Sequence, residues 1–596
     1  MIAAHRTDDE RFERALGLIE GSGVVDELEA LNVARRGVGG RPPRGITYTM
    51  KGVLVALTLL IDRCTTPSMK RVLEELVFRL DDEQLARLGM SIRASQRDAV
   101  KKREPWGREY RRFMAWLARQ VAVIDSEADQ PARRITNAED KRIRDARTSE
   151  DEEAAIEASE HGRRICNLLV AASVRDPHPD GYRGDIVVDE STFDVCKTSE
   201  DVGARATAKR SAVSIAGFYR RSEGVLVEPG TGKTSRVEKM GFGVGMTAVM
   251  RVGEPTALRR VVPVITAIDI HRPTAASLEG LRNALDCHAE NGFDPRTRTS
   301  RPQRNARWPY LTVDMGYNPL RGFAELLIER RYSMIAGYPA HWSLVSQTEH
   351  PEPTERTQEP GPIVGHGDVY CPAAARLLRT GPLVTRVRDM KQNGVAEHDA
   401  RLRQLLPMLM GTNSRIKTGA ARPGRPRRGE PTPVRHRLDV VCPAVQGRVR
   451  CPLKPESLHA SPAALPTVAP EWDATTYRCC EKSQTTIVFT EPQVKRYQGS
   501  FTPGSWEHLF HLEAYRAMTE RQFQLVKSVH TTGLDKINYG PRREPLLKLI
   551  LAIAVAVSNL EVQDAPVIRD VDSVAERFEN LARHLGRKPA KTPPRT

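Results

Sequence analysis

The sequence predicts an α/β fold in which a mixed sheet is flanked by helices and preceded by a helical region. Apolar residues recur at helical spacing up to about residue 125. Short runs rich in β-branched residues then begin near residue 185 and alternate with helical patterns until about residue 345. Because three consecutive strands precede alternating helices and strands, a mixed sheet covered by helices is the expected architecture.

The helical region, residues 1–125, is predicted from apolar periodicity in "TMKGVLVALTLLIDRC" (49–64) and "MKRVLEELVFRLDDEQLARLGM" (69–90). A third segment, "KKREPWGREYRRFMAWLARQ" (101–120), combines basic residues with four aromatic ones. That combination suits a helix that docks on DNA, and it suits equally an amphipathic helix whose basic face is solvated. We therefore assign residues 1–125 to a helical DNA-binding region. The charge-dense residues 126–182 are expected to form a helical linker.

The predicted sheet segment begins with a short apolar run in "GDIVVDES", where Ile186, Val187 and Val188 indicate a strand buried on both faces. Two further strands follow, and helices then alternate with strands. The expected order is strand 185–191, strand 241–250, strand 261–270, helix 275–289, strand 310–318, helix 320–331 and strand 332–338.

The remaining two fifths of the chain divide into three predicted segments. Periodicity is lost over residues 346–499, where the Pro-, Gly- and Arg-rich stretch 412–437 is expected to be a flexible basic arm. Helical spacing returns in residues 506–530 and in the apolar run "LLKLILAIAVAVSNL" (546–560). The last residues, within 576–596, are expected to be a basic tail.

Composition favours a protein that acts on a polyanion. The chain has 596 residues and a formal net charge of +16, which points to several domains and to nucleic acid as the leading partner. The apolar run 546–560 is short for a membrane span and is expected to be a buried core helix. The nine dispersed cysteines fit a reducing compartment, so a cytoplasmic location is expected.

Two acidic residues follow predicted strands, Asp189 in "VVDES" and Asp314 in "LTVDMGY". If both strands end at the same edge of one sheet, the two carboxylates lie side by side and repel each other unless a cation separates them. Mg²⁺ suits such a site because it is a hard cation that prefers oxygen ligands. The alternative is that each acid caps a strand end. Glu190 is expected to point to the opposite face from Asp189, and Asp269 is interpreted as a strand-end residue, as is the neighbouring His271.

A third acid, Glu520, lies in "YRAMTERQFQLVK" (515–527). Arg516, Glu520, Phe523 and Lys527 are spaced so that they share one face of a helix. A solvated face with ion pairs between successive turns would explain this pattern. A carboxylate that completes a metal site between phosphate-binding cations would explain it too.

These three acids in their contexts resemble the DDE transposases of bacterial insertion sequences, which have an RNase H-like catalytic core. In that family the first acid ends the first strand, as Asp189 does here, and the second follows the fourth strand, as Asp314 does. The third lies on a late helix in an R-x3-E-x6-K signature, which Arg516, Glu520 and Lys527 match. The resemblance covers residues 183–345 and 500–575, the two predicted parts of the core.

The resemblance departs from the family pattern at one position. The family usually has a tyrosine three residues before the signature arginine, where this chain has Glu513, and Tyr515 directly precedes Arg516 instead. The long separation of Asp314 from Glu520 implies an insertion domain, residues 346–499, before the catalytic glutamate helix.

The resemblance implies a transposase that cleaves transposon ends and joins the 3′-hydroxyl to target DNA by two-metal phosphoryl transfer. Asp189, Asp314 and Glu520 would hold two Mg²⁺ ions, for which Mn²⁺ can substitute, and Arg516 with Lys527 would contact DNA phosphates. Double-stranded DNA is the expected partner, bound by a homodimer in the nucleoid. The alternatives are a related metal-dependent nuclease without strand transfer and a catalytically inactive DNA-binding derivative.

Two other motifs give weaker signals. "EPGTGKTS" (228–235) resembles a phosphate-binding loop but has Val227 where that motif needs its first glycine. The insertion carries four cysteines that are candidate zinc ligands, but the first pair has loose spacing and the second pair is vicinal. These features favour unliganded thiols over zinc ligands at Cys442, Cys451, Cys479 and Cys480.

Overall fold

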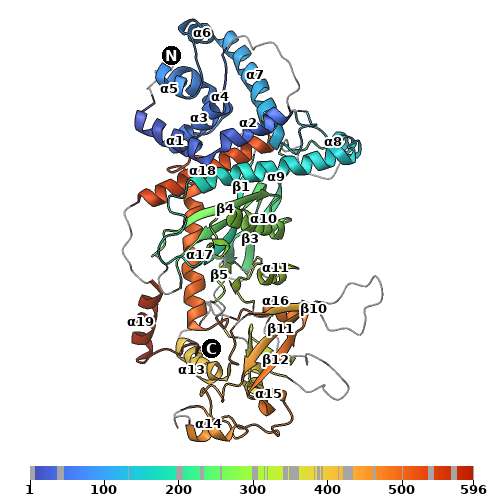
Figure 1. Ribbon diagram of the computed structural model, residues 1–596, viewed down its shortest axis with the longest axis vertical. Helices are drawn as coiled ribbons and strands as arrows, with labels where there is room; N and C mark the ends of the chain where they lie inside the picture. Colours follow the sequence, from blue (N-terminus) through green and yellow to red (C-terminus); the bar gives the residue numbers. More distant parts are fainter. Residues whose placement is uncertain are drawn as a thin grey trace.

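The computed structural model is a mixed α/β protein whose largest sheet contains both parallel and antiparallel strands. The molecule is elongated, with the N-terminal helices at one end, the largest sheet in the middle and a second, smaller sheet at the other end (Figure 1). The residues that the structure describes are 7–35, 46–131, 133–195, 206–211, 213–227, 234–255, 258, 260–298, 307–314, 316–317, 320–339, 342, 346–347, 361–380, 383–384, 390, 394–413, 415–420, 434–460, 465–499, 501–534, 543–565 and 573–594.

The N-terminal region is helical, as predicted. Several of its helices begin at a side-chain cap, such as Asp8, Thr49 or Ser68, which accepts a backbone N–H of the first turn. The apolar faces of these helices share one core with helices from the other end of the chain. The helices are α1 (Asp9–Ser22), α2 (Val24–Arg35), α3 (Met50–Asp62), α4 (Met69–Glu74), a π-helix (Glu75–Arg79), α5 (Asp82–Arg87), α6 (Ala94–Val100), α7 (Arg103–Gln120) and a 3₁₀ turn (Val121–Ile124).

Residues of the predicted helical linker form α8 (Asn137–Asp145) and the long α9 (Ser149–Ala172). Thr148 caps α9 in a reciprocal capping box with Asp151. The buried face of α9 packs against the sheet and against α18 (Figure 1). This segment is therefore helical, as expected, and its second helix is part of the core.

The largest sheet has the strands that the sequence predicts and one more. Its continuous order is β4-β3-β1-β5-β6. β2 pairs with the N-terminal half of β3, residues 234–243, as a hairpin. β1, β5 and β6 are parallel to one another, whereas β3 runs antiparallel to both β1 and β4. The strands are β1 (Ile186–Asp194), β2 (Gly217–Val227), β3 (Thr234–Arg251), β4 (Val264–His271), β5 (Tyr310–Val313) and β6 (Ser333–Ala336).

Helices cover both faces of this sheet. The side of Val188 packs with Leu285 of α10 (Ser277–Glu290) and with Phe323 of α11 (Phe323–Glu329). The side of Val187 packs with Tyr515 of α17 (Trp506–Lys527). Burial of β1 on both faces is thus confirmed. Because successive strand residues alternate between faces, each position on β1 faces either α10 and α11 or α17.

Two small antiparallel sheets and several short helices occupy the segment 346–499. The prediction of a flexible arm over 412–437 is wrong at both ends, because residues 417–420 and 434–437 pair as strands; residues 421–433 lie outside the described residues. The elements are β7 (Ser346–Gln347), β8 (Ile363–Gly365), β9 (Asp368–Tyr370), α12 (Ala375–Arg379), α13 (Gly394–Leu405), β10 (Lys417–Ala420), β11 (Val434–Val441), α14 (Pro455–Ala460), α15 (Arg478–Glu481), β12 (Gln484–Phe489) and α16 (Glu491–Arg496).

Three helices complete the chain: α17, α18 (Glu544–Asp564) and α19 (Ser573–Leu585). Among the described residues, α18 is the single helix long and apolar enough to cross a membrane, and 83% of its most apolar window is buried inside the protein. The prediction of a buried core helix is therefore confirmed. α17 runs along the long axis of the molecule beside the sheet, so it reaches from the lower region to the strand edge (Figure 1).

Candidate active site

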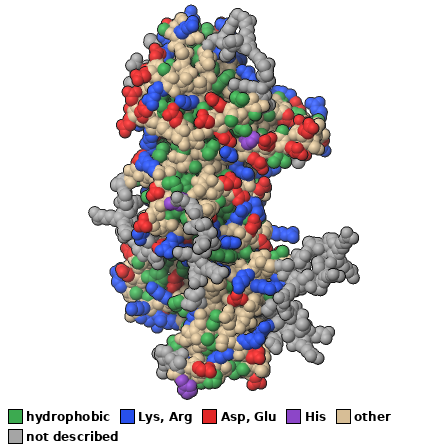
Figure 2. All heavy atoms as spheres, viewed as in Figure 1, with side chains coloured by type: hydrophobic (Ala, Val, Ile, Leu, Met, Phe, Trp, Pro, Cys, Tyr) green, Lys and Arg blue, Asp and Glu red, His purple; other side chains and the backbone are tan. Residues whose placement is uncertain are grey.

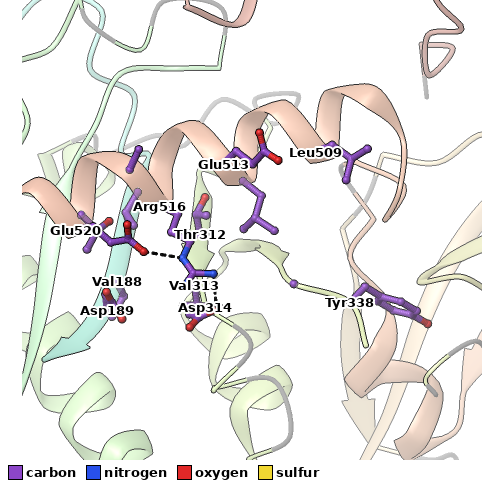
Figure 3. A pocket seen from close by; sticks show the side chains of 15 residues that line it. Val188, Asp189, Thr312, Val313, Asp314, Tyr338, Leu509, Glu513, Arg516 and Glu520 are labelled. Atoms are coloured by element: carbon purple, nitrogen blue, oxygen red, sulfur yellow. Dashed lines mark hydrogen bonds and ion pairs between the residues drawn. The ribbon is translucent and has the colours of Figure 1, made fainter. Parts of the chain in front are cut away.

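Asp189, Asp314 and Glu520 line one cavity of about 350 Å³ between the sheet and α17. Asp189 comes from β1, Asp314 follows β5 and Glu520 lies on α17 (Figure 3). Three segments that are distant in sequence therefore converge at one edge of the sheet.

The pairing of β1 with β5 explains why the two aspartates are neighbours. Val188 and Val313 are the last paired residues of these parallel strands, and each is followed directly by its aspartate. The prediction that the first strand stops at Asp189 is wrong, because β1 continues to Asp194 in its ladder with β3. The sheet divides at this point, since β1 continues along β3 while β5 has ended, and the cavity opens there.

Glu520 is linked to Asp314 by Arg516, which lies one turn earlier on α17. The guanidinium Nε of Arg516 is 2.9 Å from Oε1 of Glu520, and its Nη1 is 3.9 Å from Oδ1 of Asp314. The three side chains are about half exposed, at 54% for Arg516, 56% for Glu520 and 47% for Asp314. Figure 3 shows the guanidinium between the two carboxylates, so a cation already occupies this part of the site.

Asp189 is the most enclosed of the three acids. Burial raises its pKa to about 7, and the negative charge of Asp314 acts in the same direction. The backbone N–H of Glu190, which donates to Oδ1 of Asp189 at 2.8 Å, and the positive charge of Arg516 oppose this increase. An acid in this position holds its proton near neutral pH unless a further cation arrives.

The chemistry of the donors fits Mg²⁺, because carboxylate oxygens are the ligands that this ion prefers. Asp189, Asp314 and Glu520 would supply these oxygens. Their spacing is wider than a coordination shell: across the described part of the chain, no three His, Cys, Asp or Glu side chains are grouped closely enough to hold a metal ion. Arg516, which forms ion pairs with two of the carboxylates, supplies positive charge at the same place.

Lys527, the second predicted phosphate contact, lies beside the cavity and is not among its lining residues. Its Nζ donates to Oγ of Ser191 and to the carbonyl oxygen of Thr192, each at 2.6 Å, and stands over the ring of Phe193. Phe523, from the same predicted helix face, is buried in the core. Lys527 therefore joins the end of α17 to the part of β1 just beyond Asp189.

Three other residues considered from the sequence, Glu190, Asp269 and His271, lie outside this cavity. Glu190 points away from the cavity and accepts hydrogen bonds from the Thr274 backbone and the Ser277 hydroxyl at the start of α10. Asp269 and His271 line a separate cavity of about 390 Å³ beside α9 and α18. This position agrees with the prediction that Asp269 and His271 are strand-end residues and not part of the acidic site.

Two residues close to Arg516 on α17 lie in different places, Tyr515 in the core and Glu513 at the cavity. Tyr515 is fully buried, and its hydroxyl donates to the carbonyl oxygen of Gly253 at 2.5 Å, so it anchors α17 to the loop after β3. Glu513, at the position where the family has tyrosine, lines the cavity and forms an ion pair with Arg577. Glu513 was not predicted as a site residue. Its spacing from Leu509, Arg516 and Glu520, which puts all four on one helix face, is the sequence signal that could have indicated it.

The predicted DNA-docking helix, α7, uses its aromatic face for packing. Phe113 is fully buried, and Trp106 packs on Phe78 with ring centroids 5.5 Å apart. Trp116 and Tyr110 are partly buried against the same core. On the face seen in Figure 2, acidic and basic side chains are interspersed over the N-terminal helices. Only the basic side of α7 is thus left for a partner.

Comparison with known proteins finds no match to any protein-family model and no match among curated proteins.

Proposed function

We propose that the protein is a DDE transposase that cleaves transposon ends and joins their 3′-hydroxyls to target DNA. One observation carries the proposal: Asp189, Asp314 and Glu520, each from a different segment, line the same cavity. A sheet that merely capped its strands with acids would not require a glutamate from α17, which follows Asp314 by about 200 residues in the chain. The half-exposed Asp314 and Glu520 leave the site open to a large substrate such as DNA.

The strand order supports an RNase H-like core. When β2 is set aside as a hairpin extension of β3, five strands remain in one sheet, and Asp314 follows the fourth of them in chain order. Two strands and a helix, β3, β4 and α10, separate the first acid from the second, as the family requires. Residues 346–499 then form the proposed insertion domain between β6 and α17.

The proposed chemistry assigns a role to each side chain of the site. Two Mg²⁺ ions, or Mn²⁺ in their place, would activate water or a 3′-hydroxyl and stabilise the leaving oxygen when held by the three carboxylates. Asp189 must release its proton first, because a protonated carboxyl is a poor ligand. Arg516 would leave its carboxylate partners for a DNA phosphate, which its planar fork suits. Lys527 would hold β1 in place and contribute positive charge next to the DNA path.

Double-stranded DNA is the proposed partner, with transposon ends and target DNA as its two forms. The net charge of +16 supports binding to a polyanion. Because two transposon ends are joined in one reaction, we propose that a homodimer assembles on DNA. The basic side of α7 is the proposed contact in the N-terminal region.

The test first looks for inverted repeats on either side of the coding region and then measures cleavage and strand transfer by purified protein on those ends. Asp189→Ala, Asp314→Ala and Glu520→Gln should each abolish Mg²⁺-dependent cleavage and leave DNA binding measurable. Glu329→Gln is the matched control, since Glu329 is a surface acid of α11 paired with Arg282. Near-normal cleavage by any one of the three site variants would remove that residue from the site.

The same experiment distinguishes the alternatives. Cleaved ends without joined products would identify a metal-dependent nuclease. DNA binding without cleavage in Mg²⁺ or Mn²⁺ would identify a DNA-binding derivative that has lost catalysis, and it would overturn the proposal.

A further inference from the structure

The wall of the acidic cavity carries more negative charge than the proposed metal site uses. Its described lining residues include one cation, Arg516, and four carboxylates, those of Asp189, Asp314, Glu513 and Glu520. Glu513 lies about 10 Å from Glu520 along the axis of α17, at about 1.5 Å per residue, so it is too distant to bind the same metal ions. A DNA phosphate in the cavity would be repelled by this fourth carboxylate unless a further cation balanced it.

The cation that balances Glu513 is Arg577, which lies on α19. Its Nη1 is 2.7 Å from Oε2 of Glu513, and its guanidinium stands over the ring of Phe510, 6.0 Å from the centroid. The side chains are 37% exposed for Arg577 and 44% exposed for Glu513, so a bound polymer can reach both. Along α17, Glu513 lies on the other side of Arg516 from Glu520 (Figure 3). α19 therefore brings a second cation to this wall.

Apolar side chains hold α19 against α17. Val574 packs on the apolar cluster that contains Ala514, and the ring centroids of Phe578 and Phe510 are 5.1 Å apart. An ion pair as exposed as that of Arg577 contributes little to the free energy of unfolding. Arg577 can therefore leave its carboxylate partner without releasing α19 from α17.

We propose that Arg577 is a DNA-phosphate contact of the proposed active site, and this inference rests on the function proposed above. Without DNA, Glu513 holds the guanidinium beside the cavity. A backbone phosphate then replaces the Glu513 carboxylate, because the planar fork of arginine pairs with either anion. The distance of about 10 Å between Glu513 and Glu520 equals about three nucleotides of a DNA strand at about 3.4 Å each. The contact should therefore lie about three nucleotides from the cleaved bond.

The two halves of the ion pair should have opposite effects on DNA binding, measured by fluorescence anisotropy on transposon ends. Arg577→Ala should weaken binding about tenfold and lower the slope of log Kobs against log salt concentration by about one, because a phosphate contact is lost. Glu513→Gln breaks the same ion pair but should bind more tightly, because Arg577 remains and a repelling carboxylate is gone. Arg577→Lys should keep the salt slope, since it keeps the charge. Arg583→Ala is the control, because Arg583 is an exposed cation of α19 that bonds to Asn580 on the same helix.

Neutral phosphates in the DNA locate the contact. Single methylphosphonate substitutions are placed at each position near the cleavage site, on both strands. One substitution about three nucleotides from the cleaved bond should weaken binding by the unaltered protein and have no further effect on Arg577→Ala. The control Arg583→Ala should respond to that substitution as the unaltered protein does.

Equal weakening of DNA binding by Arg577→Ala and Glu513→Gln would overturn this inference, because it would show that only the ion pair itself matters. An unchanged salt slope in Arg577→Ala would overturn it too. Either result leaves the proposed function standing if the unaltered protein cleaves and joins the ends. A protein that binds DNA without cleavage would overturn the proposed function and still test Arg577 by these binding measurements. Absence of DNA binding by the unaltered protein would overturn both.

Discussion

At the scale of single residues, Asp189 is a largely buried acid. Its ionisation should therefore lower the free energy of unfolding. Its pKa in the folded protein is about 7, above the ordinary value of 3.8, chiefly because it is buried. The folded state holds the proton more tightly than the unfolded state, so stability is highest below about pH 4 for this group and falls as pH rises toward 7. The difference between the two pKa values corresponds to about 4 kcal/mol as an upper limit.

Asp189→Asn should remove this pH dependence. The variant should unfold at a higher denaturant concentration than the unaltered protein at pH 8 and show little difference at pH 4.5. Urea unfolding at the two pH values measures the effect, with the surface variant Asp180→Asn, 89% exposed, as control. Equal shifts at both pH values would show that the carboxyl is ionised in the folded protein throughout this range.

Arg516 is the cation that moderates the acidic site, and Arg516→Ala should expose its two roles. The guanidinium lowers the pKa of Asp189, so Arg516→Ala should raise that pKa. The pH above which metal-dependent cleavage sets in should rise with it. If Arg516 contacts a DNA phosphate, as proposed, Arg516→Ala should also lower the slope of log Kobs against log salt concentration by about one. Arg521→Ala, on the exposed side of the same helix, is the control. An unchanged pH profile would show that Arg516 does not control the protonation of Asp189.

A site residue could be predicted from the sequence where the residues next to it in the chain mark it as unusual. Asp189 and Asp314 each follow apolar strand residues, and Glu520 has a cation one turn away, so each stands out locally. The continuation of β1 beyond Asp189 was not predictable, because it depends on pairing with β3. The same holds for Lys527, whose contacts with Ser191 and Thr192 join segments that are distant in sequence.

At the scale of elements, the close approach of α10 to the sheet depends on Gly280. A Cβ atom at this position would lie 2.3 Å from the ring of His271 and 3.1 Å from Oγ1 of Thr247. His271 cannot move aside easily because it is buried and its Nε2 is 2.8 Å from that threonine oxygen. The glycine therefore sets how near the helix packs.

Gly280→Ala should destabilise the protein by about 1–3 kcal/mol through overpacking, which outweighs the helical preference of alanine, about 1 kcal/mol. Gly17→Ala in α1 is the matched control, since nothing lies within 4 Å of its Cβ position, and it should raise stability slightly. Thermal unfolding of the two variants should give shifts of opposite sign. A stabilising Gly280→Ala would mean that α10 can move away from the sheet.

Elements were predictable where a buried face imposes a pattern. Buried apolar residues recur at the spacing that a helix or a strand requires in α17, α18, β1, β4 and β5. β2 was missed because "YRRSEGVLV" mixes charges with few apolar residues, and it is paired only along β3. The strands β10 and β11 were missed for the same reason, since their basic residues resemble those of a loop.

At the scale of the whole molecule, one core joins the two ends of the chain. α18 packs against α3, α9 and β4, so a helix from the last tenth of the sequence completes the N-terminal core. Its buried Lys548 forms an ion pair with Glu544 at 2.6 Å, which allows a charged residue to lie inside an apolar helix. The run of apolar residues in this helix is explained by burial on all sides.

The buried carboxylate of Asp399 in α13 is one of the groups that hold the chain after α19. This side chain has no exposed surface and accepts hydrogen bonds from the backbone N–H of Ala590 at 2.7 Å and from the indole N–H of Trp506 at 3.2 Å. It also forms ion pairs with Arg403 at 2.9 Å and with Arg587 at 3.2 Å. Burial alone would raise its pKa, but these donors lower it, so its stabilising contribution holds at neutral pH and is lost as pH falls below the ordinary value of 3.8.

Removal of the residues from Gly586 onward should therefore destabilise the protein by about 1–3 kcal/mol, because Asp399 stays buried and loses two of its donors. The same truncation should cost less in an Asp399→Asn background, where the neutral side chain needs fewer donors. A double-mutant cycle by urea unfolding at pH 7 measures this coupling, and Arg583→Ala, whose side chain bonds only locally to Asn580, is the control. If the truncation costs the same with and without the carboxylate, the tail is held by its other contacts, such as those of Thr592 with Glu507, and Asp399 serves only to position Trp506.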